Sequence, residues 1–253
     1  MRILAVAQNT FREAIRDKVL YVLLFFAAAA ILGSKAIGWV SIGQDIKIMK
    51  DLSLAAVLVF GVLIAIFIGT NLVYKEIDKR TLYTIISRPM RRYEFILGKY
   101  FGLAFVLALV TFIMTAAGAL YVVALGGTVT LAYFLAVLLI YWELLLITAF
   151  AVLLSVLTSP ILGALIVFSI FLFGHATSIL VDLPQQLESS AARHMLHAVY
   201  YIVPNLSNFN IRAEAANAMD VSLSYVAWAM TYGAIYTAML LFLAALAFEE
   251  KDM

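Results

Sequence analysis

One acidic residue, Glu143, stands alone in a long apolar stretch of the 253-residue sequence. From Tyr100 to Val181 there are 82 residues, and Glu143 is the only formal charge among them. A carboxylate in the middle of a membrane costs at least about 2.5–3.5 kcal/mol unless it is paired or protonated. Glu143 is therefore expected to face other helices or a cavity. One interpretation places it on a translocation path or in a coupling switch, and the other makes it a protonated structural glutamate.

The histidines suggest a second chemistry, metal binding. His194 and His197 are three residues apart, on one face of a helix, with Glu188 nearby, while His175 lies in an apolar run. A zinc site needs three or four ligands, and the sequence has neither an H-E-x-x-H pattern nor any cysteine. We therefore expect no metal site and no catalytic residues in this chain.

A nucleotide site is also missing from the sequence. The phosphate-binding loop has the pattern G-x-x-x-x-G-K-[ST]. Gly98-Lys99 supplies only its last Gly-Lys pair, because Tyr93 stands five residues before Gly98 and Tyr100 follows Lys99. Any ATP-driven step must use ATP bound by another polypeptide, and we expect no cofactor here.

The composition places these residues in a membrane protein. Hydrophobic residues make up 65% of the chain, charged residues 13%, and the mean hydropathy is +1.04. A soluble domain has about 45–50% apolar and about 25% charged residues, so an ordinary soluble enzyme and a disordered chain are both excluded. The net charge of +2 gives no general attraction for nucleic acid.

Six apolar runs are each long enough to cross the hydrocarbon core, which takes about 20 residues of helix. They are 19–39, 52–74, 95–123, 131–157, 161–181 and 225–248. Gly126-Gly127 and Thr158-Ser159-Pro160 separate the third, fourth and fifth runs. Because lipid offers no partner to the backbone, the spans must be helices. The sequence predicts an all-α polytopic membrane protein with a single domain, 1–253.

Residues 1–18 differ from the six runs. Apolar side chains recur there at helical spacing, with charged residues largely on the other side, which predicts an amphipathic helix lying in the membrane interface. The apolar residues are Ile3, Leu4, Ala7, Phe11, Ala14 and Ile15. A leader of this length that carries acids as well as bases argues against a cleaved signal peptide. In the third span, Gly98-x-x-x-Gly102 permits close helix packing, although such pairs also occur by chance.

The basic residues predict an orientation. With six spans both chain ends share a side, and twelve of the seventeen lysines and arginines fall on that side. The positive-inside rule then puts both termini in the cytoplasm. Two hydrophilic segments remain, 75–94 in the cytoplasm and 182–224 outside. The external segment has two interpretations, an outer gate or exit funnel and a cap that seals the bundle.

The cytoplasmic segment is densely charged. Seven basic and three acidic residues lie in the 25 positions from Lys75 to Lys99. Its apolar residues favour a short amphipathic helix over 76–87, which Pro89 ends. Composition alone favours a loop that only fixes the topology. The order of the residues, however, indicates a more specific role for this segment.

That order resembles the conserved cytoplasmic loop of ABC-2 type permeases, the membrane subunits of ATP-binding-cassette exporters. The matching residues are Glu76, Thr81-Leu82, Ser87-Arg88-Pro89, Arg92, Glu94 and Gly98-Lys99. Pro204-Asn205-Leu206, Phe209-Asn210 and the charged tail after Phe248 also look like the family.

The resemblance implies the ABC-2 (type V) exporter fold, with a coupling helix in 75–94 that docks on a separate ATPase. The docking residues it implies are Glu76, Arg80, Thr81, Leu82, Arg88, Pro89 and Arg92. It further implies two ATPase subunits that bind ATP and Mg²⁺, a second copy of this permease or a close homologue, and export from a prokaryotic plasma membrane. The alternative is a non-ABC secondary transporter or a membrane-embedded assembly factor.

Overall fold

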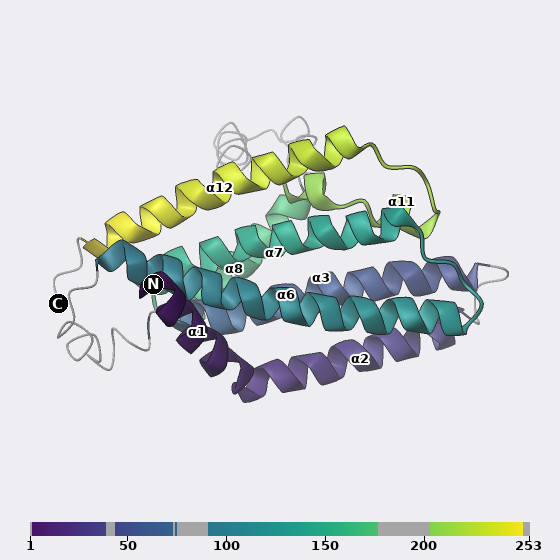
Figure 1. The fold of residues 1–253 in the computed structure, drawn as a ribbon, viewed down its shortest axis with the longest axis horizontal. Helices are drawn as coiled ribbons and strands as arrows, with labels where there is room; N and C mark the ends of the chain where they lie inside the picture. The colour runs from purple at the N-terminus through teal and green to yellow at the C-terminus, as the bar shows by residue number, and fades with distance from the viewer. Residues whose placement is uncertain (1, 39–43, 73, 75–90, 177–202, 250–253) are drawn as a thin grey trace, which may run out of the picture.

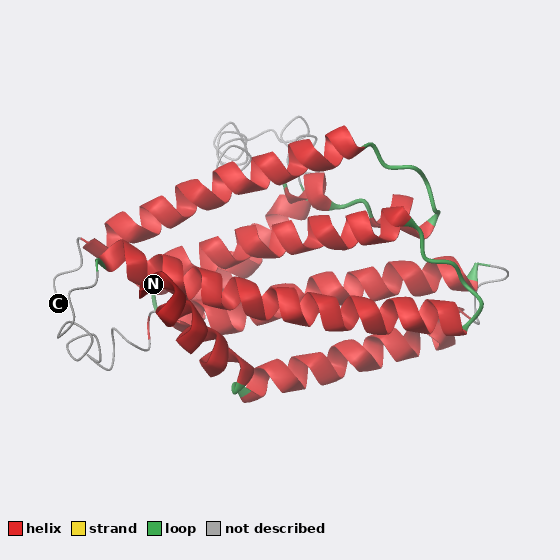
Figure 2. Ribbon diagram, viewed as in Figure 1, coloured by secondary structure: helices red, strands yellow, loops and turns green. Residues whose placement is uncertain are grey.

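The computed structural model describes residues 2–38, 44–72, 74, 91–176 and 203–249. In these ranges the chain forms helices joined by short loops, without any strand (Figure 2). The helices are α1 (Arg2–Ile15), α2 (Lys18–Gly38), α3 (Asp45–Leu72), α6 (Arg92–Ala124), α7 (Leu131–Leu157), α8 (Pro160–His175), the 3₁₀ turn η1 (Leu206–Phe209), α11 (Arg212–Ala216) and α12 (Leu223–Glu249).

Five helices of the described ranges, α2, α3, α6, α7 and α12, are long and apolar enough to cross a membrane. The predicted all-helical membrane architecture is therefore confirmed in this part of the chain. The apolar helix α8 has 16 residues, which at 1.5 Å per residue falls short of the roughly 30 Å hydrocarbon core. The sequence expects a span over 161–181, but α8 ends at His175, and 177–181 lie outside the described residues.

Charged residues extend α3 beyond its apolar part. The sequence expects the second span to begin at residue 52, whereas α3 begins at Asp45. Lys47, Lys50 and Asp51 occupy its first two turns. Side chains of this kind reach polar surroundings from the end of a membrane helix, so charge does not stop the helix there.

A sharp break separates α1 from α2. Asp17 lies between them, and its carboxylate accepts a hydrogen bond from the Val19 amide at 2.9 Å, as a helix N-cap does. Figure 1 shows α1 crossing the start of α6 at an angle to the other long helices. The interfacial position predicted for residues 1–18 stays a prediction.

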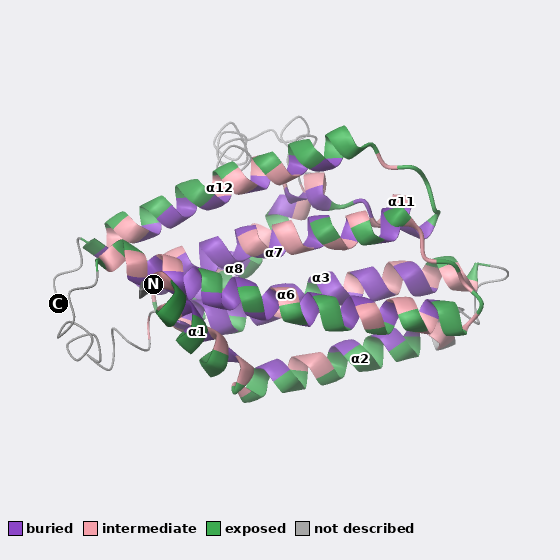
Figure 3. Cartoon of the chain, in the orientation of Figure 1, coloured by how far each residue is buried: buried purple, intermediate pink, exposed green. Residues whose placement is uncertain are grey.

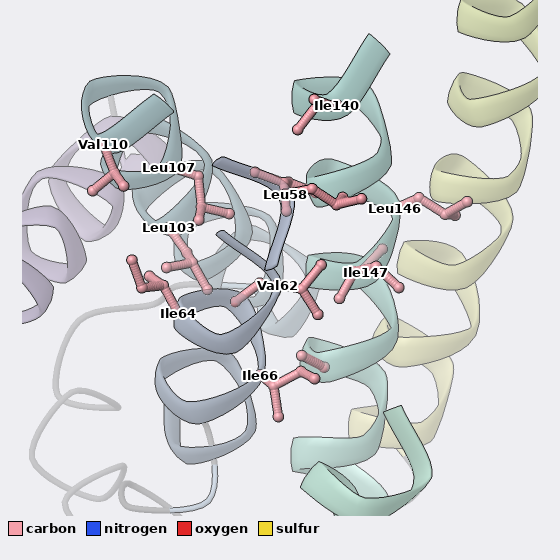
Figure 4. Close-up of a cluster of buried hydrophobic side chains, with 14 of the residues drawn as sticks. Leu58, Val62, Ile64, Ile66, Leu103, Leu107, Val110, Ile140, Leu146 and Ile147 are labelled. Carbon is pink, nitrogen blue, oxygen red and sulfur yellow. The ribbon is translucent and has the colours of Figure 1, made fainter. Parts of the chain in front are cut away.

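The core lies around α3 and α7, the two most buried long helices, whereas α2 and α12 expose most of their surface (Figure 3). Apolar side chains of α3, α6 and α7 interdigitate there (Figure 4). Two glycines bring α3 against α7. A Cβ on Gly61 would lie 2.6 Å from Leu144 Cδ1, and a Cβ on Gly69 would lie 2.7 Å from the Cβ of Ala151. Small residues of this kind let membrane helices approach closely.

The bundle has two ends, which we name after the short helices found there (Figure 1). The α1 end holds α1, the start of α6 and the end of α12. The α11 end holds α11, the end of α2, the start of α3 and the end of α6.

Candidate functional site

The predicted docking residues fall largely outside the part of the chain that the structure describes. These are Glu76, Arg80, Thr81, Leu82, Arg88 and Pro89. The seventh, Arg92, is the first residue of α6 and lies at the α1 end of the bundle. Its contacts therefore show which helices adjoin the end of the predicted coupling segment.

The side chain of Arg92 binds the end of α12. Its Nη1 atom donates to the carbonyl oxygens of Phe248 at 2.9 Å and of Glu249 at 2.6 Å. The last carbonyls of a helix carry a partial negative charge and have no partner within the helix. A guanidinium group at this position supplies both a positive charge and hydrogen-bond donors. The docking role of Arg92 stays a prediction, but in the structure its guanidinium links two helices of its own chain.

A stacked pair of rings reinforces this link. The rings of Phe95 and Phe248 lie 5.6 Å apart with 18° between their planes, and both residues are buried. Arg92 and Phe95 are three residues apart and so share one face of α6. The first turn of α6 is thereby joined to the last turn of α12 by a polar and an apolar contact.

The next turns of α6 hold α1. A Cβ on Gly98 would lie 2.6 Å from the Cβ of Val6, and one on Gly102 would lie 2.5 Å from the Cβ of Thr10. The Gly98-x-x-x-Gly102 pair, which is weak evidence in the sequence, is therefore the surface on which α1 packs.

An ion pair crosses the same contact. Lys99 Nζ lies 3.6 Å from Glu13 Oε2 and 5.6 Å from the centre of the Phe95 ring. Lys99 is buried, whereas Glu13 is half-exposed. We name the contacts of Arg92, Phe95, Gly98, Lys99 and Gly102 with α1 and α12 the cytoplasmic junction, following the predicted orientation.

The second site is built around Glu143, in the middle of α7. Its Oε1 atom lies 3.5 Å from Nε2 of His175, the last residue of α8. Glu143 is fully buried, and among the described residues neither of its carboxylate oxygens has a hydrogen-bond partner. His175 Nδ1 lies 3.3 Å from the Phe171 carbonyl oxygen. A proton on Nδ1 donates to that carbonyl and leaves Nε2 facing the carboxyl group.

A short segment that includes the 3₁₀ turn η1 covers the end of α8 beyond His175. Ser207 donates its hydroxyl to the His175 carbonyl at 3.3 Å, and Leu206 packs where a Cβ on Gly174 would stand. The backbone amide of Asn205 donates to the Tyr232 hydroxyl at 2.9 Å. Irregular backbone within a membrane bundle is tolerated where protein covers it, and Leu206 is fully buried.

Phe209 and Arg212 complete this region. Phe209 is fully buried beneath α12, where its ring would lie 3.0 Å from a Cβ on Gly233. The Nε atom of Arg212 donates to Asn210 Oδ1 at 3.1 Å, and the charge of Arg212 acts on both Glu143 and His175. Glu143, His175 and Arg212 form a polar cluster in which Glu143 is fully buried and the other two residues are partly exposed. We call it the outer cluster, following the predicted orientation.

The metal hypothesis has no support in this part of the chain. His194, His197 and Glu188 lie outside the described residues, and in the ranges described no group of three or more histidines or acids can hold an ion.

Comparison with protein families gives a match over almost the whole chain. The model of a family described as ABC-2 family transporter protein matches residues 4–253. The chain belongs to the ABC-2 transporter family. No curated protein matches it.

For an ABC-2 chain, the two sites have distinct chemical capacities. This family provides the multi-pass membrane subunit of ABC transporters, working with an ABC ATPase. The cytoplasmic junction can transmit force, because buried rings and close-packed glycines leave little room for slippage. The outer cluster can hold or release a proton, since the buried carboxyl group of Glu143 faces the partly exposed imidazole of His175.

Sequence reasoning did not find His175 as the partner of Glu143 in this ABC-2 chain. A usable signal exists. Glu143 stands 15 residues before Thr158 and His175 stands 16 after Ser159, so an antiparallel hairpin turning at 158–159 puts them at one depth. Arg212 could not be placed in this way, because 177–202 separates it from α8.

Proposed function

We propose that this chain is the permease subunit of an ABC-2 exporter, driven by a separate ATPase through a coupling helix in 75–94. The match over residues 4–253 carries the proposal. In support, the coupling segment leads directly into α6, whose first turns hold α1 and α12 together. A helix that docks on a motor needs such a rigid connection to several membrane helices.

In this proposal two copies of the permease, or this chain and a close homologue, form the path between them. Two ATPase subunits bind ATP and Mg²⁺, since this sequence has no phosphate-binding loop. Six spans put both termini in the cytoplasm of a prokaryotic cell, with α8 and the segment after it making the fifth span. The distribution of lysine and arginine supports this orientation.

The outer cluster acts as a switch in this mechanism. It joins the middle of α7 to the end of α8 and to the segment 203–212. Motion of α12 at the cytoplasmic junction is passed along its length to Tyr232 and Gly233, which contact that segment. In this mechanism Glu143 lies at the level of the membrane from which the transport path opens toward the external side.

The test is purification of the tagged chain in mild detergent, followed by mass spectrometry. Recovery of a P-loop ATPase in equal amount is the expected result, and an active preparation without any ATPase would favour the secondary transporter or assembly factor. Arg80→Glu with Arg88→Glu should abolish the copurification. Asp220→Lys, a charge reversal at an exposed residue between α11 and α12, should leave it intact. Copurification that survives the double reversal would remove these arginines from the docking surface.

A further inference from the structure

A cavity of about 630 Å³ with both polar and apolar lining lies at the α11 end of the bundle, and none of its lining residues belongs to the two sites described above. Its lining comes from the ends of several elements. Lys35 belongs to α2, Lys47 and Lys50 to α3, and Asn217 follows α11. The cavity therefore lies where membrane helices end, at the depth of lipid headgroups rather than of acyl chains.

Two lysines of this cavity have no counterion among the residues that the structure describes. Lys50 is only 4% exposed, and within the described chain neither Lys47 nor Lys50 forms an ion pair or a side-chain hydrogen bond. Burying an ammonium group without a partner is costly, so a buried lysine is normally paired. An anion in the cavity would supply the missing charge.

The start of α3 favours the same kind of ligand. The helix has 28 residues and begins at Asp45, so the unpaired amides of its first turn face this end of the bundle with a partial positive charge. Asp45 adds an acceptor, because its buried Oδ1 has no hydrogen-bond partner in the described ranges. The cavity thus combines cations for an anionic group with one acceptor for a hydroxyl group.

We propose that this cavity binds the headgroup of an anionic phospholipid of the phosphatidylglycerol type. The phosphate lies against Lys47, Lys50 and the start of α3, with Lys35 adding to the positive field. A glycerol hydroxyl donates to Asp45. The bound lipid connects α2 and α3 to the residues after α11, and so steadies the segment that carries Arg212.

The experiment uses the purified full-length chain in detergent, with phosphatidylglycerol or phosphatidylcholine added. Bound lipid is counted by native mass spectrometry, and the melting temperature is followed in parallel. We expect phosphatidylglycerol to be retained and to raise the melting temperature, with little effect of phosphatidylcholine. Lys47→Gln with Lys50→Gln should weaken retention roughly thirtyfold, since each lysine near a lipid surface contributes about 1 kcal/mol.

A matched variant, Arg12→Gln with Lys18→Gln, removes two exposed cations at the α1 end and should keep the lipid. If Lys50→Gln prevents folding, Lys47→Gln alone changes an exposed side chain and should weaken retention about fivefold. Equal loss in the matched variant, or equal retention of phosphatidylcholine, would overturn the proposal. Tight binding of soluble glycerol phosphate without any effect of lipid would overturn the assignment to a lipid.

Discussion

The Oε1 atom of Glu143 lies 3.5 Å from Nε2 of His175, and these two atoms have no hydrogen-bond partner among the described residues. They belong to antiparallel neighbours, α7 and α8, and meet in the interior of the bundle. A single proton shared between carboxyl and imidazole satisfies both atoms at once. Loss of that proton leaves a buried carboxylate beside a neutral imidazole.

Replacing Glu143 by Gln keeps the shape of the side chain and removes its proton chemistry. We expect the ATPase activity of the assembled transporter to fall fivefold or more, about the size of a modest coupling free energy. The dependence of that activity on pH should flatten, because the variant has no carboxyl group that can share a proton with His175. The measurement is ATP hydrolysis by the reconstituted complex between about pH 5 and 8.

The control for Glu143→Gln is Asp220→Asn, which removes an exposed carboxylate of the segment before α12. Its activity and pH profile should match those of the unmodified chain. An unchanged profile in Glu143→Gln would instead identify Glu143 as a structural residue.

Replacing Arg92 by Ala should release the end of α12. The guanidinium makes two hydrogen bonds to carbonyl groups, and hydrogen bonds that involve a charged group are worth about 1.5–3 kcal/mol. We expect a lower melting temperature in detergent, measured by thermal unfolding. Arg91→Ala changes the exposed neighbour and should have little effect. Equal melting temperatures for the two variants would show that the link to α12 contributes nothing to stability.

Replacing Gly102 by Val should separate α1 from α6. The added atoms meet Thr10 Cβ and, at 2.7 Å from the Cβ position, the backbone oxygen of Ala7, which cannot move aside as a flexible side chain can. Overpacking of this kind costs about 1–3 kcal/mol. Because the chain has no cysteine, a pair introduced in α1 and α6 reports their contact by cross-linking.

The control for Gly102→Val is Gly33→Val, because nothing lies within 4 Å of a Cβ on Gly33. Cross-linking should fall in Gly102→Val alone. Retained cross-linking would mean that α1 is held by its other contacts, such as the ion pair of Glu13 and Lys99.

Replacing Phe209 by Ala should loosen the segment beneath α12. The ring is fully buried, and removing a buried phenylalanine side chain typically costs about 3–5 kcal/mol. Met219→Ala, in the loop between α11 and α12 and 57% exposed, serves as the comparison. Faster proteolysis near residue 210 in Phe209→Ala, but not in Met219→Ala, is the expected outcome. Similar proteolysis of both would argue that Phe209 does not anchor the segment.

Periodicity and length were sufficient to predict the long helices, because each membrane helix must satisfy its own backbone and therefore appears as an apolar run. Periodicity and length did not predict the ends of helices that are surrounded by polar groups or by other parts of the protein instead of lipid. α3 begins seven residues before the apolar run because Lys47 and Lys50 face the cavity at the α11 end, and α8 stops at His175 because Ser207 and Leu206 cover its end. Neither contact follows from local sequence.

At the two sites as well, the sequence predicted some residues, whereas their contacts followed only from the fold. The isolation of Glu143 was evident from composition, but its partner required the hairpin of α7 and α8. Gly98 and Gly102 looked unremarkable among thirteen glycines until α1 was found against them. Arg92 was predicted from a family resemblance. The resemblance says nothing about the carbonyl groups that Arg92 binds, which belong to Phe248 and Glu249, more than 150 positions further along the chain.

That long separation has a consequence for biogenesis. At roughly 5–20 residues per second, the ribosome reaches Phe248 about 8–30 s after Arg92. The helices α1 and α6 can meet during synthesis, whereas the contact with α12 must wait for these later residues. In a nascent chain the first turns of α6 can therefore be packed on α1 before their partner on α12 has been synthesised.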